Sequence, residues 1–186
     1  MDSKLQIISG VFRGRKLRLP PDARPTQNRA RIALFNMLES GIIAPGDHFN
    51  VWDAFAGSGA FGLECLSRYP NATVVFTDTS ATSIKTVRDN LATLNIGPRA
   101  TVVHADAIFS TQKYVSQSDL IFIDAPYSNP ELGLSFVAGA TQYAKSGTIL
   151  IWEQEVTNKH EPNTTQWDIL RDKTYGRARF LILQRK

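Results

Sequence analysis

From residue 49 onward, short apolar runs alternate with segments of helical periodicity, and this alternation limits the possible folds more than any other feature. The apolar runs are rich in Val, Ile and Phe with little polar alternation, which is typical of strands buried on both faces. They lie at residues 49–55, 72–78, 99–106, 118–126 and 147–154, and helices are expected at residues 60–69, 80–95 and 131–144. The pattern predicts an α/β fold with a mostly parallel twisted sheet and helices on both faces.

The end of the chain predicts an antiparallel addition to this sheet. Two further strand-like runs occupy residues 165–172 and 177–186, and only Lys-Thr-Tyr-Gly separates them. So short a connection joins antiparallel strands, because a parallel pair needs a crossover of about a dozen residues or more. In sheets of this kind, ligands bind outside the carboxyl ends of the parallel strands, so the residues at those ends are candidates for a functional site.

The first 45 residues read differently from the rest. Residues 5–19 contain two short extended runs around a turn, and a Pro-rich connector follows them. A helix is expected from a cap at Thr26 to about Ser40. With 186 residues in all, the chain is expected to form a basic N-terminal hairpin and helix, residues 1–45, joined to one main domain, residues 46–186.

Composition excludes several classes of protein. The chain contains no run of about 18 apolar residues, which argues against a membrane-spanning helix, and its first residues lack the apolar core of a secretion signal. The single cysteine, Cys65, rules out a disulfide framework. The three histidines, His48, His104 and His160, show no metal-ligand spacing. We therefore expect a cytoplasmic protein without a metal and, since no helix face is left apolar without a partner, a monomer.

The net charge of +4 is unevenly distributed. Residues 1–45 carry a net charge of +5, residues 46–170 one of −6, and residues 171–186 one of +5. If the two basic ends fold onto one face, that face attracts polyanions such as nucleic acid. Charged termini that bind no partner give the same pattern, so charge alone leaves both interpretations open.

A glycine-rich segment follows the first predicted strand directly. Asp53 ends that strand, and Gly57, Gly59 and Gly62 form a G-x-G-x-x-G pattern that leads into a helix, which is the context of a nucleotide-binding loop. Asp78 ends the next strand, where a carboxylate can accept hydrogen bonds from both hydroxyls of a ribose. The alternative is a glycine-rich turn without a ligand, but Asp78 at this spacing favours a nucleotide-like cofactor.

NAD is the usual ligand of such a loop, but two features argue against it here. The chain has no residues left over for a separate substrate domain. Asp53 precedes the glycines, where its charge would repel a pyrophosphate but attract the ammonium group of an amino acid.

A third feature is the segment Asp124-Ala125-Pro126-Tyr127, which lies at the end of a buried strand and therefore at the same edge as the glycine loop. Asp124 and the carbonyl group of Ala125 can accept hydrogen bonds from an exocyclic amino group, and the Tyr127 ring can stack on a planar substrate. An ordinary strand-ending turn uses the same residue types. Together with the glycine loop, the segment predicts a site for a planar amine.

These motifs together resemble those of class I S-adenosylmethionine-dependent amino-methyltransferases, and the N-terminal segment narrows the resemblance. The block Ile7 to Leu17, with Arg24-Pro25-Thr26 and Arg31 to Leu38, is similar to the opening of the RsmD family. This family consists of bacterial methyltransferases that act on guanine N2 of small-subunit ribosomal RNA. Tyr175-Gly176 and the last strand are also similar to it, so the resemblance covers essentially the whole chain. Ala125 departs from the family, which usually has a proline there; we expect the chemistry to survive and loop rigidity, and so substrate fidelity, to be affected.

The resemblance implies a Rossmann-like class I methyltransferase fold, S-adenosylmethionine as cofactor and S-adenosylhomocysteine as product, without a metal. It also implies that the glycine loop holds the methionine part and that Asp106 accepts a hydrogen bond from the adenine amino group. A helix cap is the alternative role of Asp106. The implied cofactor-binding residues are Asp53, Phe55, Gly57, Gly59, Gly62, Asp78, Asp106 and Ala107, and the implied catalytic residues are Asp124, Ala125, Pro126 and Tyr127.

The same resemblance implies a partner, either ribosomal RNA or the small ribosomal subunit. The residues expected to contact phosphates are Arg13, Arg15, Lys16, Arg18, Arg24 and Arg29. The target base must leave its stack to reach the catalytic turn, where the Tyr127 ring would replace the lost stacking.

Three other functions remain open on the sequence. The same chemistry can act on adenine in DNA or RNA or on a protein glutamine, since each presents a planar amino group. An NAD-dependent oxidoreductase would bind NAD(H) but not S-adenosylmethionine. A non-catalytic RNA-binding module with a degenerate cofactor pocket would bind the cofactor without turnover.

Overall fold

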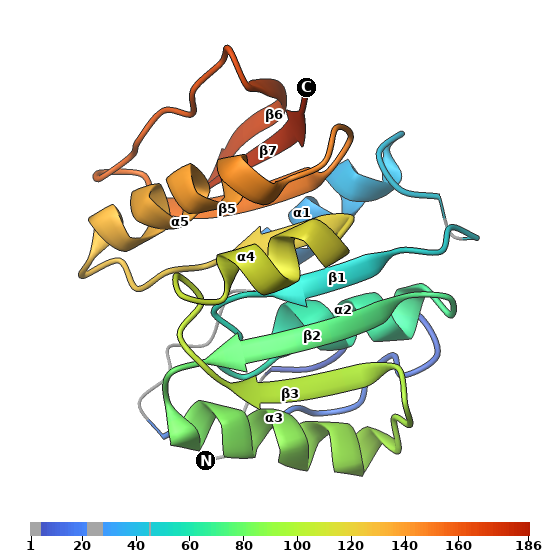
Figure 1. The fold of residues 1–186 in the computed structure, drawn as a ribbon. Helices are drawn as coiled ribbons and strands as arrows, with labels where there is room; N and C mark the ends of the chain where they lie inside the picture. The colour runs from blue at the N-terminus through green and yellow to red at the C-terminus, as the bar shows by residue number, and fades with distance from the viewer. Residues whose placement is uncertain (1–4, 22–27, 45) are drawn as a thin grey trace.

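The computed structural model describes residues 5–21, 28–44 and 46–186, which form an α/β structure around a seven-stranded sheet (Figure 1). The strands are β1 (Asn50–Asp53), β2 (Thr73–Asp78), β3 (Ala100–His104), β4 (Leu120–Ile123), β5 (Ile149–Glu155), β6 (Trp167–Tyr175) and β7 (Ala178–Arg185). Their order is β3-β2-β1-β4-β5-β7-β6, with β1 to β5 mutually parallel and β7 antiparallel to both of its neighbours. The predicted fold class, a mostly parallel sheet with an antiparallel C-terminal hairpin, is confirmed.

Helices cover both faces of the sheet and enclose two apolar cores. The helices are α1 (Asn28–Glu39), α2 (Ala60–Arg68), α3 (Ala81–Leu94), the short α4 (Thr111–Tyr114) with a 3-10 turn (Val115–Gln117), and α5 (Pro130–Tyr143). The first core lies between the sheet and α1, α2 and α3, and the second lies between the sheet and α4 and α5. Figure 1 shows α4 and α5 in front of the sheet and α1 and α2 behind it.

Strand β4 illustrates why the central strands are apolar throughout. Leu120 and Phe122 point into the first core, whereas Ile121 and Ile123 point into the second. Because side chains alternate along a strand and both faces are covered, every position of such a strand is buried. The short helix over residues 111–117 was not predicted, since a segment of one to two turns carries too little periodicity to reveal itself.

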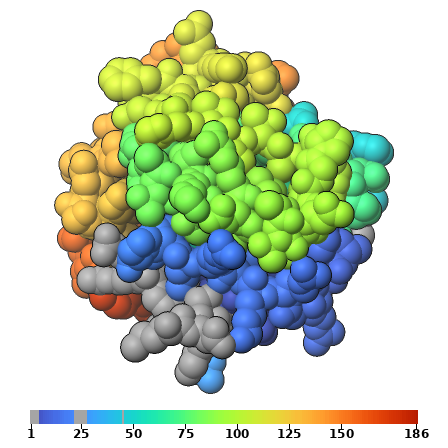
Figure 2. All heavy atoms as spheres, turned by 90° about the horizontal axis from the view of Figure 1, so that it is seen from below, coloured from blue at the N-terminus to red at the C-terminus, as the bar shows by residue number. Residues whose placement is uncertain are grey.

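The N-terminal segment, residues 5–21, packs onto the α1–α3 face of the sheet rather than forming a separate layer. Leu5, Ile7 and Leu17 are buried in the first core, and Figure 2 shows the segment running beside α3. The predicted extended runs do face each other, but their pairing is limited to one antiparallel bridge between Gln6 and Lys16.

Helix α1 begins at Asn28, and the predicted cap residue Thr26 lies outside the described residues. The described part of the chain contains no helix that is both long and apolar enough to span a bilayer.

Candidate active site

A cavity of about 850 Å³ lies at the carboxyl ends of the parallel strands and joins the two motifs predicted from the sequence. Its wall includes Asp53, Phe55, Gly57, Asp78, Asp106, Ala107, Asp124, Ala125, Pro126 and Tyr127. Two predicted cofactor residues, Gly59 and Gly62, are not part of this wall. The volume falls in the range of about 300–1,000 Å³ that small-molecule sites occupy.

The three glycines of the loop, Gly57, Gly59 and Gly62, have different structural roles. Gly57 lines the cavity. Gly59 precedes α2 with a φ of 77°, a left-handed conformation that disfavours other residues. Gly62 lies inside α2, where an added Cβ would stand 2.3 Å from the Phe76 ring, so a glycine is needed for the helix to approach β2.

Two carboxylates fix the shape of the glycine loop. Asp53 is 1% exposed, and its Oδ2 accepts a hydrogen bond of 3.1 Å from the amide of Gly62. Burial, with a further contribution from the charge of Asp78, raises the pKa of Asp53 to about 8. Asp78, at the end of β2, accepts hydrogen bonds of 2.8 Å from the amides of Gly57 and Ser80.

Asp106 follows β3 and also reaches the cavity. Its Oδ1 accepts a hydrogen bond of 2.7 Å from the amide of Ile108, which makes a tight local turn. The helix-cap alternative is wrong for this residue, because α4 begins at Thr111 with Ser110 in the cap position. The neighbouring Ala107 is buried against the second core and forms part of the same wall.

The turn after β4 and the end of β5 bring a second pair of acidic groups, Asp124 and Glu153, into the cavity. Tyr127 donates a hydrogen bond of 2.8 Å from its hydroxyl to Oε1 of Glu153, near the end of β5. Burial raises the pKa of Asp124 well above its ordinary value, and the charges of Glu153 and Asp53 add to the shift. Burial likewise raises the pKa of Glu153 to about 7 and raises that of Tyr127. This end of the cavity therefore presents several hydrogen-bond acceptors that are buried away from solvent.

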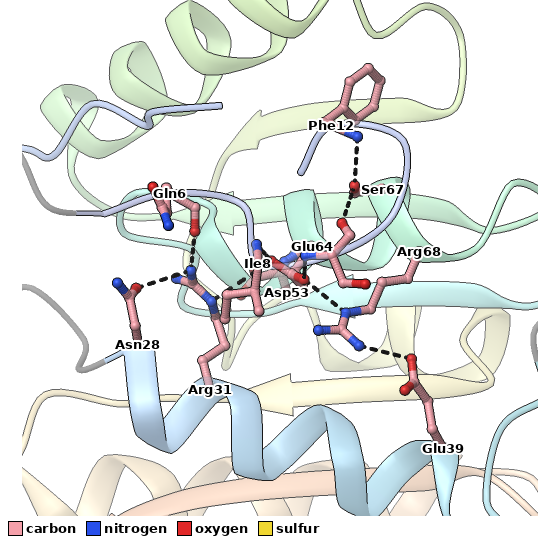
Figure 3. Close-up of polar contacts among 12 residues, drawn as sticks. Gln6, Ile8, Phe12, Asn28, Arg31, Glu39, Asp53, Glu64, Ser67 and Arg68 are labelled. Atoms are coloured by element: carbon pink, nitrogen blue, oxygen red, sulfur yellow. Dashed lines mark hydrogen bonds and ion pairs between the residues drawn. The ribbon is translucent and has the colours of Figure 1, made fainter. Parts of the chain in front are cut away.

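A buried network at Glu64 of α2 attaches the N-terminal segment to the site (Figure 3). The Glu64 carboxylate, fully buried, accepts hydrogen bonds from the amides of Ile8 and Ser9 at 2.8 and 2.9 Å and from Nε of Arg68 at 2.7 Å. Ile7 donates to the carbonyl of Arg15 in the second run. Because the next amide on that side, that of Ser9, is bound to α2, the ladder between the two runs does not continue.

Arg31 of α1 enters the same network from the other side. Its Nη2 donates to the carbonyl of Gln6, and its Nε lies 3.9 Å from Glu64. The side chain is 3% exposed and also lines the cavity. The network therefore joins α1, α2 and the N-terminal segment at one wall of the candidate site.

The predicted phosphate-contacting residues lie on the surface. Arg13, Arg15, Lys16, Arg18 and Arg29 are exposed, and Arg24 lies outside the described residues. Two of them are held against α3: the Arg15 guanidinium donates to the carbonyl of Thr93 at 2.9 Å, and Arg18 pairs with Asp89 at 3.2 Å. No cluster of His, Cys, Asp or Glu suited to a metal ion occurs within the described ranges.

Sequence reasoning missed several residues of the cavity wall. They are Ala30, Arg31 and Leu34 from α1, Phe61 and Phe122 from the first core, Glu153 from β5, and Tyr175, Arg177, Ala178 and Phe180 from the final hairpin. Glu153 carried a usable signal, since it lies near the carboxyl end of a parallel strand, at the same edge as Asp53 and Asp124. Arg31, Leu34 and Tyr175 lie in segments that resemble the RsmD family, but no local pattern places them at the cavity, because their approach to it depends on tertiary packing.

Comparison with known proteins agrees with this architecture. The family model described as "Conserved hypothetical protein 95" matches residues 5–184. The chain is 33% identical to the ribosomal RNA small subunit methyltransferase D of Escherichia coli (strain K12) over 187 residues, covering 98% of this chain and 91% of that protein. It is 30% identical to the protein of the same name from Haemophilus influenzae, covering 97% of this chain and 94% of the other.

Among solved structures, the putative methyltransferase yhhF from Escherichia coli superposes with a TM-score of 0.79 at 31% identity, covering 97% of both chains. The putative methylase HI0767 from Haemophilus influenzae gives a TM-score of 0.75 at 25% identity, covering 97% of this chain and 98% of the other. Since the family model and the relatives both span nearly the whole sequence, the chain belongs to the RsmD family, which that model describes.

Proposed function

We propose that this protein transfers a methyl group from S-adenosylmethionine to the exocyclic N2 of a guanine in small-subunit ribosomal RNA. The observation that carries the proposal is the single cavity that contains both the glycine loop with Asp78 and the Asp124–Tyr127 turn. The names of the relatives, ribosomal RNA small subunit methyltransferase D, support the same substrate class.

The cavity wall fits such a cofactor in its donor and acceptor groups. Asp78 keeps lone pairs on both oxygens for the ribose hydroxyls after binding the amides of Gly57 and Ser80. Asp53 has one oxygen bound to Gly62 and presents a carboxyl group for the ammonium of the methionine part. Asp106 and Ala107 line the part of the wall after β3, where the adenine would lie.

When bound, S-adenosylmethionine supplies an electrophilic methyl group, so the protein has to prepare the nucleophile. The lone pair of guanine N2 is delocalised into the ring. Asp124 and the carbonyl of Ala125 accept hydrogen bonds from the two N2–H groups, which favours the form with a localised lone pair. Holding N2 in line with the methyl carbon supplies proximity, a contribution that reaches about 7–11 kcal/mol in well-oriented reactions.

Asp124 also receives the proton that N2 loses as the new bond forms. The N2–C bond forms while the C–S bond breaks, and one N2–H proton passes to the carboxylate. Burial raises the pKa of Asp124 and so makes its ionised form a stronger proton acceptor. Tyr127, fixed by its hydrogen bond to Glu153, presents its ring to the flipped base.

We further propose that residues 1–45 form the RNA-contacting part. Their exposed basic side chains, among them Arg13, Arg15 and Lys16, lie on a segment that is tied to α2 through Glu64 and to α3 through Arg18. Phosphate contacts there would orient the substrate toward the cavity without reading its sequence.

The test is transfer of labelled methyl groups from S-adenosylmethionine to small subunits lacking their native methylation, to naked ribosomal RNA and to duplex DNA. Nucleosides of the product are then identified by mass spectrometry. We expect N2-methylguanosine in ribosomal RNA, a loss of about 10²–10⁴-fold in kcat for Asp124→Ala, and near-normal cofactor binding by that variant. Asp168→Asn, a change at an exposed position outside the cavity wall, is the matched control.

Label in DNA or in N6-methyladenosine would replace the proposed substrate by another planar amine. Cofactor binding without transfer to any RNA would favour a binding module. Weakened cofactor binding by Asp124→Ala would move that residue to the cofactor site.

A further inference from the structure

Glu153 is a buried carboxylate in the cavity wall that the proposed transfer step does not use. Its side chain is 7% exposed, and its Oε1 accepts the hydrogen bond from Tyr127. Across the described residues, no Lys, Arg or His lies within ion-pair distance of it; Arg177, on the same wall, is paired with Glu155 instead. A buried carboxylate without a cation costs free energy unless its oxygens find hydrogen-bond donors. Oε1 has the Tyr127 hydroxyl as its donor, and a ligand that offers an N–H group would supply a second donor to the carboxylate.

The register of β4 and β5 sets Glu153 beside Asp124. Ile123 lies opposite Trp152 in this parallel pair of strands. Asp124 follows Ile123 and Glu153 follows Trp152, so these two residues are neighbours as well. Because side chains alternate along a strand, and Ile123 and Trp152 point into the second core, Asp124 and Glu153 point to the opposite face, into the cavity. Glu153 is near enough to contribute to the raised pKa of Asp124. Two acceptor groups thus stand side by side.

We propose that Glu153 selects guanine by accepting a hydrogen bond from its N1–H group while Asp124 and the Ala125 carbonyl bind N2. The proposal rests on the proposed function, because it needs a guanine in this cavity. On the Watson–Crick edge of guanine, the N1–H donor lies directly beside the N2 amino group. Adenine instead presents the N1 lone pair beside its amino group. Above its pKa of about 7 Glu153 is ionised, and a carboxylate repels that lone pair.

The apolar residues around Glu153 strengthen this discrimination between guanine and adenine. Leu34, Phe61, Phe122 and Phe180 form an apolar part of the same wall, and the rings of Phe61 and Phe122 stack at 4.1 Å. In such a low-dielectric site an unpaired polar group is expensive. A site built to bind a donor therefore rejects analogues that lack it more strongly than an apolar pocket rejects a change of size.

The alternative to direct recognition is that Glu153 only positions the Tyr127 ring. The substitution Glu153→Gln separates these two roles. The glutamine keeps the shape and one oxygen for the Tyr127 hydroxyl, but it offers an amide N–H₂ where the second carboxylate oxygen stood. Tyr127→Phe is the matched control, because it removes the hydrogen bond to Glu153 and leaves the carboxylate in place.

The experiment compares two substrates: RNA with guanosine at the methylated position, once mapped, and the same RNA with 2-aminopurine there. 2-Aminopurine retains the 2-amino group but has a lone pair at N1 and no O6. We expect the wild type to prefer guanosine by about 10–100-fold in kcat/KM. Glu153→Gln should lose activity on guanosine by a similar factor and keep or gain activity on 2-aminopurine, so that the preference shrinks to within about threefold. Tyr127→Phe should lower both activities while keeping the preference.

A wild type that uses both substrates equally would overturn the proposal without any variant, and so would a Glu153→Gln enzyme that loses both activities by one common factor. Melting temperature and S-adenosylhomocysteine affinity of each variant show that it is folded. Failure of the proposed function itself looks different, because the wild type would then form no N2-methylguanosine.

Discussion

The carboxylate of Asp78, at the end of β2, accepts a hydrogen bond of 2.8 Å from the amide of Gly57, in the loop after β1. The two residues are 21 positions apart in the sequence, yet one bond joins the acidic group and the glycine loop. The other carboxylate oxygen binds the amide of Ser80, which precedes α3. The loop and the acid are therefore held in a fixed relation before any ligand enters.

Removing this carboxylate should weaken cofactor binding first. We expect Asp78→Ala to raise the Kd for S-adenosylhomocysteine by about 10–100-fold, because it removes charge-assisted hydrogen bonds to the ribose and loosens Gly57. Asp78→Asn, which keeps an acceptor for Gly57, should have a smaller effect. Isothermal calorimetry measures both, with Asp168→Ala at an exposed position outside the cavity wall as control. Unchanged affinity in Asp78→Ala would remove Asp78 from the ribose site.

The fold and the order of the functional groups could be predicted from the sequence because buried strands have a recognisable composition. Strands buried on both faces are largely apolar, so β1, β4 and β5 stand out as runs, and polar residues near their ends are conspicuous. Asp53 and Asp124 were found in this way, and Asp78 was found from its place at the end of the strand that follows the glycine loop. The structure brings all three to one cavity.

The remaining wall could not be predicted because it depends on long-range packing. Arg31 reaches the cavity only because α1 docks beside α2, and Phe180 only because the last hairpin adds to β5. The N-terminal runs were predicted from their extended pattern, but their amides are bound by Glu64, 55 or more positions away. No local pattern reveals such a partner.

The buried carboxyl of Asp53 should make stability depend on pH. Its pKa is about 8 in the folded protein and about 4 in an unfolded chain. Between these two pKa values the carboxyl of Asp53 is ionised in the unfolded chain and protonated in the folded protein. The free energy of unfolding is therefore highest at low pH and falls as the pH rises toward 8. Asp53→Asn removes this loss, while its amide oxygen can still accept from Gly62.

We therefore expect the free energy of unfolding of Asp53→Asn to match the wild type near pH 4 and to exceed it by on the order of 2–4 kcal/mol at pH 8. Urea unfolding of the ligand-free protein at a series of pH values measures the difference. A difference that stays constant from pH 4 to pH 8 would contradict the burial of an ionisable Asp53. The same variant should bind S-adenosylmethionine less tightly, since an amide cannot ionise to pair with the ammonium group.

RNA affinity should fall steeply with salt if the exposed basic residues contact phosphates. Each phosphate contact contributes about 0.7–0.9 to the slope of log K against log salt concentration. We expect Arg13→Gln to reduce the magnitude of the slope by about that amount. Lys145→Gln, exposed beyond the end of α5 on the opposite side of the sheet, should leave it unchanged. A flat salt response of the wild type would refute the basic RNA-binding surface.

Two glycines of the N-terminal turn allow a test of how this segment is attached to α2. Gly10 and Gly14 both have a φ of 80°. A Cβ at Gly10 would lie 2.0 Å from the carbonyl oxygen of Ser67, whereas a Cβ at Gly14 would meet no atom within 4 Å. Ser67 holds the turn by accepting the amide of Val11 at its carbonyl, at 2.9 Å. Its hydroxyl accepts the amide of Phe12 at 3.0 Å (Figure 3).

Gly14→Ala should therefore cost only the left-handed conformation, about 1–2 kcal/mol, while Gly10→Ala should also break the contact with α2 and cost roughly twice as much or more. Denaturant unfolding measures both. Because the turn carries Arg13 and Arg15, Gly10→Ala should further weaken RNA binding and leave the affinity for S-adenosylhomocysteine near that of Gly14→Ala. Equal losses of stability in the two variants would mean that the close approach of Gly10 to Ser67 does not hold the segment in place.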